Sequence, residues 1–118
     1  MAYLLLIHEP RGQRAGRAAD EARQRYDEMM AFSADLQARG LLKAAESLRT
    51  DEHAVRINRA DGTLRLLDGP FAEAREMVGG FFLLDVADRD EALDIARRCP
   101  AVAWATVEVR ECAPCHVP

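Results

Sequence analysis

Cysteine, lysine and long apolar runs are scarce in this sequence, and each scarcity argues against a class of protein. The three cysteines are an odd number, so they do not make the disulfide framework of a small secreted domain. Lys43 is the only lysine and the net charge is −4, so we expect no binding to nucleic acid. No apolar run approaches the roughly 18 residues of a membrane-spanning helix, so we expect no membrane span.

The beginning of the chain, MAYLLLIH, is apolar but is not typical of an export signal. It lacks both a positively charged start and a cleavage site of small residues. We therefore expect a cytoplasmic protein, whose thiols stay reduced. The length of 118 residues predicts one domain with one hydrophobic core.

The C-terminal segment ECAPCHVP contains a C-x-x-C-H spacing, formed by Cys112, Cys115 and His116, which in c-type cytochromes attaches haem. Attached haem needs export, a pocket and an axial partner, yet only two residues follow His116. The three side chains are also one ligand short of a closed zinc site. We therefore expect no cofactor and no metal, and a flexible tail over residues 113–118.

The hydrophobic pattern predicts alternating strands and helices with one inserted hairpin. Gly40 is a helix stop, Asp61-Gly62 is a hairpin turn, and Asp88 with Glu91 forms a capping box. The predicted elements are a strand over residues 2–8, a loop over 9–17, a helix over 18–39, a strand over 41–48, a hairpin over 54–67, a polar connection over 72–78, a strand over 81–86, a short helix between Asp88 and Pro100, and a strand over 105–111.

This order predicts a ferredoxin-like α+β fold, βαββαβ with an inserted β-hairpin, as a single domain over residues 1–112. The strands at 2–8 and 81–86 are apolar at almost every position, which is typical of central strands buried on both faces. Two helices cover one face of such a sheet. We expect a second copy of the chain to cover the other face in a symmetric dimer; the alternative is that the hairpin folds over it.

The predicted topology brings His8, Ser47, Arg49 and Asp68 to one end of the sheet, near Arg17. His8 and Asp68 there would form a catalytic general acid/base pair. Ser47, Arg49 and Arg17 would bind the substrate, the arginines holding a carboxylate or phenolate. Simpler roles stay open: the ring of His8 could be satisfied by the backbone at the strand end, and Asp68 could be a turn residue.

Several segments carry a family resemblance: YLLLIH, SLR, VRINRADGTLRLLDGPFAE, GGFFLLDV, DEALDIARRCP and VEVRE. The chain resembles the YCII-related family, and DGPFAE followed by a GGF strand is typical of its DGPF branch. The resemblance ends before Ala113. It implies a dimeric α+β barrel, and from other branches a His and an Asp that act as an acid/base pair. Some branches carry the His at the start of the first helix, where this chain has RAGRAADEARQRY, so His8 is the candidate here.

Two functions follow from these observations. The first is a cofactor-independent acid/base enzyme of lyase or isomerase type, which acts on a small organic molecule. Relatives of similar architecture carry out such steps on small ring compounds. The alternative, implied by the resemblance alone, is a small-molecule-binding or regulatory protein that accompanies a sigma factor of the extracytoplasmic-function type.

Overall fold

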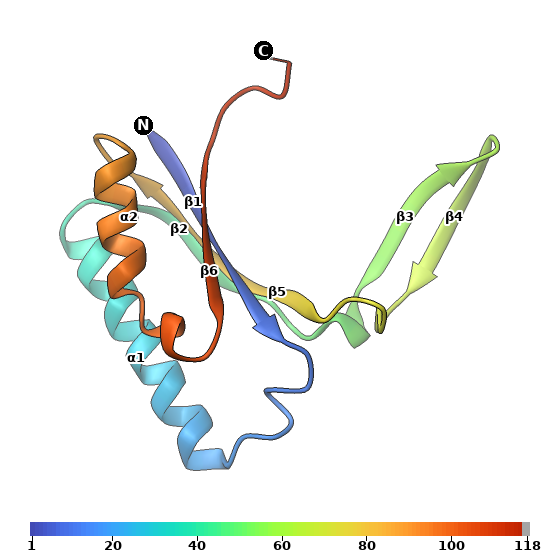
Figure 1. Ribbon diagram of the computed structural model, residues 1–118, viewed down its shortest axis with the longest axis horizontal. Coiled ribbons are helices and arrows are strands. Elements are labelled where there is room, and N and C mark those ends of the chain that lie inside the picture. Colours follow the sequence, from blue (N-terminus) through green and yellow to red (C-terminus); the bar gives the residue numbers. More distant parts are fainter. Residues whose placement is uncertain (117–118) are drawn as a thin grey trace.

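In the computed structural model, which describes residues 1–116, two helices pack on one face of a four-stranded antiparallel sheet (Figure 1). The strands lie in the order β2-β5-β1-β6, so the predicted ferredoxin-like α+β fold is confirmed. A separate two-stranded sheet is formed by β3 and β4. The elements are β1 (Ala2–Pro10), α1 (Ala19–Ala38), β2 (Leu42–Ser47), the short 3₁₀ helix η1 (Asp51–His53), β3 (Val55–Ala60), β4 (Thr63–Asp68), β5 (Glu76–Asp85), α2 (Arg89–Arg98), η2 (Pro100–Ala103) and β6 (Thr106–Glu111).

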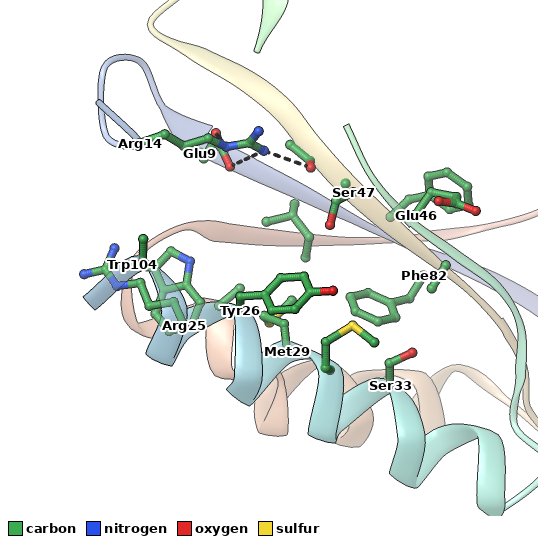
Figure 2. A pocket seen from close by; sticks show the side chains of 18 of the residues that line it. Glu9, Arg14, Arg25, Tyr26, Met29, Ser33, Glu46, Ser47, Phe82 and Trp104 are labelled. Atoms are coloured by element: carbon green, nitrogen blue, oxygen red, sulfur yellow. Dashed lines mark hydrogen bonds and ion pairs between the residues drawn. The ribbon is translucent and has the colours of Figure 1, made fainter. Parts of the chain in front are cut away.

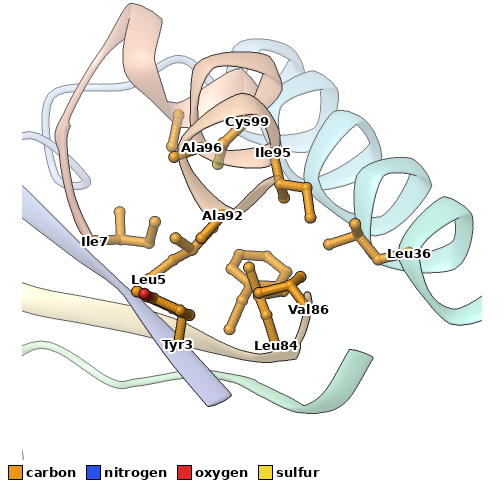
Figure 3. Packing of buried hydrophobic residues seen from close by; sticks show 12 residues of the cluster. Tyr3, Leu5, Ile7, Leu36, Leu84, Val86, Ala92, Ile95, Ala96 and Cys99 are labelled. Atoms are coloured by element: carbon orange, nitrogen blue, oxygen red, sulfur yellow. The ribbon is translucent and has the colours of Figure 1, made fainter. Parts of the chain in front are cut away.

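The core lies between the central strands and the two helices (Figure 3). Side chains alternate along β1, so Tyr3, Leu5 and Ile7 point toward the helices and are buried. Leu36 of α1 meets them, with an exposed fraction of only 1%. The core side chains from β5 and α2 are Phe82, Leu84, Ala92, Ile95 and Ala96.

Local signals end and begin the helices as predicted. Gly40 has a positive φ of 72°, and the Leu41 amide donates to the Leu36 carbonyl at 3.0 Å, which closes α1 in a Schellman motif. At α2 the Asp88 side chain accepts from the Glu91 amide at 2.9 Å. The predicted N-cap at Asp88 is therefore confirmed. Among the described residues the Glu91 carboxylate accepts from the Ala87 amide, at 3.0 Å, rather than from the Asp88 amide of a standard capping box, and both negative charges lie at the positive end of the helix.

The hairpin of β3 and β4 extends away from the body of the molecule (Figure 1). Asp61 and Gly62 both have positive φ, 51° and 76°, as a tight two-residue hairpin turn requires. At its base, Gly69 approaches the Asp51 backbone so closely that an added Cβ would lie 1.7 Å from the carbonyl oxygen. The apolar side chains of the hairpin are exposed: Val55, Ile57, Leu64, Leu66 and Leu67.

The other face of the sheet is covered by neither helix. It presents Leu4, Leu6 and His8 of β1, which alternate with the buried positions and are half-buried. The prediction that residues 2–8 and 81–86 form the two central strands is confirmed, because β1 and β5 pair with each other and each has a second neighbour. The expectation that both faces of these strands are buried is not met within one chain.

Two boundaries differ from the sequence-based predictions. Strand β1 continues through Glu9 to Pro10, where a loop was expected, and β5 begins at Glu76 rather than at Phe81. The two extensions pair with each other, Glu9 with Met77 and Pro10 with Glu76, so tertiary pairing overrides the local loop signals. Of the predicted tail, residues 113–116 are exposed and follow no regular structure, and residues 117 and 118 lie outside the described residues.

Candidate functional site

A cavity of about 620 Å³ lies between α1 and the helix-facing side of the sheet (Figure 2). Its volume is within the roughly 300–1,000 Å³ of ordinary small-molecule sites. One end is charged and the middle is apolar. The residues that line it include Glu9, Arg14, Arg17, Arg25, Tyr26, Met29, Ser33, Ser47, Gly79, Phe82 and Trp104.

Glu9 supplies a buried carboxylate to the cavity wall. It lies on the same face of β1 as Leu5 and Ile7, because side chains alternate, and only 6% of the residue is exposed. Arg14 Nε lies 2.7 Å from Glu9 Oε1 in an ion pair that is not aligned as a hydrogen bond, and Arg14 Nη2 donates to Glu9 Oε2 at 3.2 Å. A buried charge is tolerated only with such a partner.

Arg14 in turn is fixed by the backbone of two strand regions. Its Nη1 donates to the Leu48 carbonyl at 2.7 Å, and its Nη2 donates to the Gly79 carbonyl at 3.1 Å. The loop before α1 is thereby tied to the end of β2 and to β5. The orientation of the Glu9 carboxylate is consequently set by contacts from three segments.

Gly79 leaves the space that the Glu9 carboxylate occupies. An added Cβ would lie 2.2 Å from Glu9 Oε2 and 3.0 Å from Arg14 Nη2. At Gly80 the added Cβ would lie 2.9 Å from the Glu46 carbonyl on the neighbouring strand. The two glycines are therefore required by close approach of other atoms rather than by unusual backbone angles.

Arg17 is held at the same end of the cavity but forms no ion pair with a carboxylate within residues 1–116. Its Nη2 donates to Gln13 Oε1 at 2.8 Å, and Gln13 Nε2 donates to the Trp104 carbonyl at 2.7 Å. Its Nε is buried and has no hydrogen-bond acceptor among residues 1–116. Burial, and next the charge of nearby Arg25, lower the pKa of Arg17 below its usual value.

Arg25 and Trp104 close the side of the cavity near the α1 N-terminus. The Arg25 guanidinium forms an ion pair with Glu21 at 2.7 Å, one turn away on α1. It also stacks over the Trp104 ring, 4.9 Å from the ring centroid. Figure 2 shows the Tyr26 ring, Met29 and Phe82 in the apolar middle of the cavity.

A second cavity, of about 710 Å³, lies at the base of the hairpin. His8 reaches it from the uncovered face of the sheet, and His8 Nε2 lies 2.7 Å from Glu108 Oε1. Arg11 binds Asp51 through both terminal nitrogens, at 2.7 and 2.6 Å. The hydrogen bonds from Arg11 hold the pKa of Asp51 at about 2, below its ordinary 3.8.

The five residues predicted for the site are divided between these places. Ser47 and Arg17 line the first cavity. His8 and Arg49 line the second, where Arg49 Nη2 is 3.3 Å from His53 Nε2. Asp68 ends β4 opposite Val55, lines neither cavity, and shares no hydrogen bond with His8 in the part of the chain that the structure describes.

Four charged residues that line the first cavity were not predicted as site residues from the sequence: Glu9, Arg14, Arg25 and Glu46. For Glu9 a signal was present, since Tyr3, Leu5, Ile7 and Glu9 continue one alternation and only the expected strand end at residue 8 hid it. Arg14 and Arg25 carry no such signal. Their partners, Leu48, Gly79 and Trp104, are distant in the sequence.

The side chains of the C-x-x-C-H segment lie at the surface. Cys112 and Cys115 are free and exposed. No three His, Cys, Asp or Glu side chains within residues 1–116 are grouped to hold a metal ion. Within the same residues, neither helix has the length and apolar character needed to cross a membrane.

Comparison with known proteins places these features in a family. The chain matches the YCII-related domain over residues 1–115, which extends past the domain end expected at residue 112. It is also similar to an uncharacterised protein of Rhizobium meliloti (strain 1021), with 30% identity over 97 residues that cover 82% of this chain and 78% of that protein. The chain therefore belongs to the YCII-related family.

Proposed function

We propose that this protein is a cofactor-independent acid/base enzyme of lyase or isomerase type, which moves a proton on a small organic molecule bound between α1 and the sheet. The observation that carries this proposal is Glu9, a carboxylate with an exposed fraction of 6% in the wall of a ligand-sized cavity. Burying a charge is costly, and such groups concentrate at functional sites.

Glu9 would accept the proton, and Arg14 would orient the carboxylate through its contacts with both oxygens. The hydroxyl groups of Tyr26, Ser33 and Ser47 line the same cavity and would donate hydrogen bonds to the developing oxyanion of the substrate. Met29 and Phe82 would exclude water from the reacting atoms.

His8 and Glu108 supply a second place for the same class of chemistry. Their 2.7 Å contact resembles a His–carboxylate acid/base pair, and Arg49 lines the adjoining cavity. In this alternative Glu108 takes the role that the sequence suggested for Asp68. Both His8 and Glu108 are more exposed than Glu9, with side-chain exposed fractions of 26% and 42%, so we favour Glu9.

The experiment that tests the proposal is solvent deuterium exchange. Small lactones and ketones with an acidic C–H bond are incubated in D₂O with the protein, and loss of the C–H signal is followed by proton NMR. Glu9→Gln should slow the catalysed exchange by about 10²–10⁴-fold, which is the usual contribution of a general base. Glu111→Gln on β6 should leave exchange unchanged.

The His8→Ala variant distinguishes the two places. If His8→Ala abolishes exchange while Glu9→Gln retains it, the reaction belongs to the second cavity. Exchange that is equal in the wild-type protein and in Glu9→Gln, for every compound that the wild-type protein turns over, contradicts the role of Glu9. Folded structure is checked for each variant by circular dichroism.

We also propose that the protein acts as a homodimer. The uncovered sheet face carries Leu4, Leu6 and the neighbouring Phe81 and Leu83, and the projecting hairpin carries further exposed apolar side chains. A two-stranded hairpin without such cover is only marginally stable in water. A second copy of the chain, related by a two-fold axis, would cover both surfaces at once.

A further inference from the structure

We infer that the molecule bound between α1 and the sheet is a small organic monoanion, a carboxylate or phenolate with an apolar body, whose charged oxygen contacts the guanidinium of Arg17. The inference rests on the proposed function for the place of the site and adds the class of ligand. It follows from the charges around the cavity, from the buried Arg17 Nε, which has no acceptor among residues 1–116, and from the apolar lining.

Of the three arginines at the charged end of the cavity, two form ion pairs within residues 1–116 and one, Arg17, does not. Arg14 is paired with Glu9, and Arg25 is paired with Glu21. Arg17 forms no ion pair within residues 1–116, and its hydrogen bond goes to the neutral side chain of Gln13. A single negative charge in the cavity would pair with the remaining guanidinium.

A ligand oxygen would also supply Arg17 with a hydrogen-bond acceptor and a negative charge. The Nε of Arg17 is buried and lacks an acceptor among the described residues, although buried donors are nearly always hydrogen-bonded. Burial and the nearby charge of Arg25 lower its pKa, so the surroundings disfavour the cationic form. An anion at this place would offset both effects.

The position of the guanidinium is fixed before a ligand arrives. Gln13 accepts from Arg17 at 2.8 Å and is itself fixed by its 2.7 Å hydrogen bond to the Trp104 carbonyl. Little side-chain freedom is left to lose on binding, which favours affinity. The Gln13–Trp104 contact thus acts as a positioning element for Arg17.

The remainder of the cavity sets the body and the charge of the ligand. Met29, Phe82 and Trp104 provide apolar and aromatic surface, which fits a ring or a short branched chain. Glu9 lies in the same wall and would repel a second negative charge. A monoanion therefore fits better than a phosphate ester or a dicarboxylate.

The test measures binding rather than turnover. Isothermal titration calorimetry is carried out with benzoate, cyclohexanecarboxylate, phenolate-forming nitrophenol, the neutral isostere benzamide and the dianion phenyl phosphate. We expect at least one monoanion to bind the wild-type protein, and we expect benzamide and phenyl phosphate to bind at least about tenfold more weakly than the best monoanion.

Arg17→Gln should weaken binding of that monoanion by about tenfold or more, because the charge-assisted hydrogen bond is lost. Arg23→Gln is the matched control on the outer side of α1, where the side chain is 78% exposed, and it should bind like the wild-type protein. Unchanged affinity in Arg17→Gln, or benzamide binding as tightly as benzoate, would overturn the inference. So would the absence of binding for every monoanion up to about 10 mM.

The outcome separates this inference from the proposed function. A monoanion that requires Arg17 for binding, in a protein that exchanges no C–H proton, upholds the ligand class and rejects the enzyme. Proton exchange that depends on Glu9 but not on Arg17, with neutral compounds as the substrates, upholds the enzyme and rejects the ligand class.

Discussion

At the scale of single residues, the position of the Glu9 side chain requires a glycine at position 79. The carboxylate of Glu9 occupies the volume that a side chain at position 79 would need. We expect Gly79→Ala to lower the free energy of unfolding by about 1–3 kcal/mol, because either the carboxylate or the strand must move. Urea denaturation followed by circular dichroism measures this change.

Gly16→Ala provides the matched control for that substitution. An added Cβ at Gly16 would meet its nearest atoms at 3.7 and 3.8 Å, which is ordinary contact. This variant should be as stable as the wild-type protein or more stable by up to about 1 kcal/mol, since alanine restricts the unfolded chain. Equal stability of the two variants would contradict the tight packing of Gly79 against Glu9.

Asp51 gives a residue-scale prediction for pH. The hydrogen bonds from Arg11 lower its folded-state pKa from 3.8 to about 2, so the unfolded chain binds this proton more readily. The resulting stabilisation is fully present above about pH 4 and is lost as the pH falls through about 2. The stability difference between the wild-type protein and Asp51→Asn should therefore shrink over this window, as measured by urea titrations at several pH values.

Arg11→Gln removes the donors of the Arg11–Asp51 contact rather than its acceptor. It should therefore abolish the same part of the pH dependence of the free energy of unfolding. The two substitutions act on one contact, and the double variant should cost little more than either single one. A constant difference between wild type and Asp51→Asn from pH 5 to about pH 2 would show that the Arg11 contact does not perturb the titration of this carboxyl.

At the scale of elements, the sequence-based predictions succeeded where a short local signal decides the structure. Gly40 ends α1, Asp61-Gly62 turns the hairpin, and Asp88 caps α2, each through contacts within a few residues. The end of β1 depends instead on pairing with Glu76 and Met77, far along the chain. For this reason Glu9 was assigned to a loop and its place in the cavity was missed.

The residues predicted for one site are divided between two cavities for a related reason. The predicted strand order of the sheet is confirmed, but the face on which a side chain lies depends on its position in the alternation along its strand. His8 and Glu9 are neighbours in sequence and belong to opposite faces of the sheet. Ser47 and Arg17 accordingly lie in one cavity, and His8 and Arg49 lie in the other.

Helix α1 yields an element-scale prediction, because its attachment depends on few buried side chains. Leu36 is its only fully buried residue in the described structure, with an exposed fraction of 1%. Leu36→Ala should lower the free energy of unfolding by about 2–5 kcal/mol, since it leaves a cavity against the sheet. Met30→Ala, at a position that is 51% exposed, should change it by only about 0.5 kcal/mol. Comparable losses in both would mean that α1 is anchored elsewhere.

At the scale of the whole molecule, the proposed dimer predicts that the hairpin contributes to association. Ile57 and Leu66 are cross-strand neighbours with exposed fractions of 61% and 64%. The wild-type protein should sediment at about twice the 13.1 kDa chain mass. The double substitution Ile57→Lys and Leu66→Lys should raise the dimer dissociation constant by about 100-fold or more, because it places charges in an apolar contact.

Val102→Lys is the control for association, since Val102 is 52% exposed but lies in η2, away from the hairpin. It should sediment like the wild-type protein. A wild-type monomer at micromolar concentration would reject the dimer. A dimer unaffected by the lysine pair would confine the interface to the uncovered sheet face.

The alternation along β1 has a consequence for how this chain can vary over evolution. Successive residues face the ligand cavity and the opposite side of the sheet in turn, with Ile7 and Glu9 on one side and Leu6 and His8 on the other. Individual positions can be exchanged for residues of similar character. Insertion or deletion of a single residue would transfer every following side chain to the wrong side. Homologous sequences should therefore vary in composition along this strand while keeping its length.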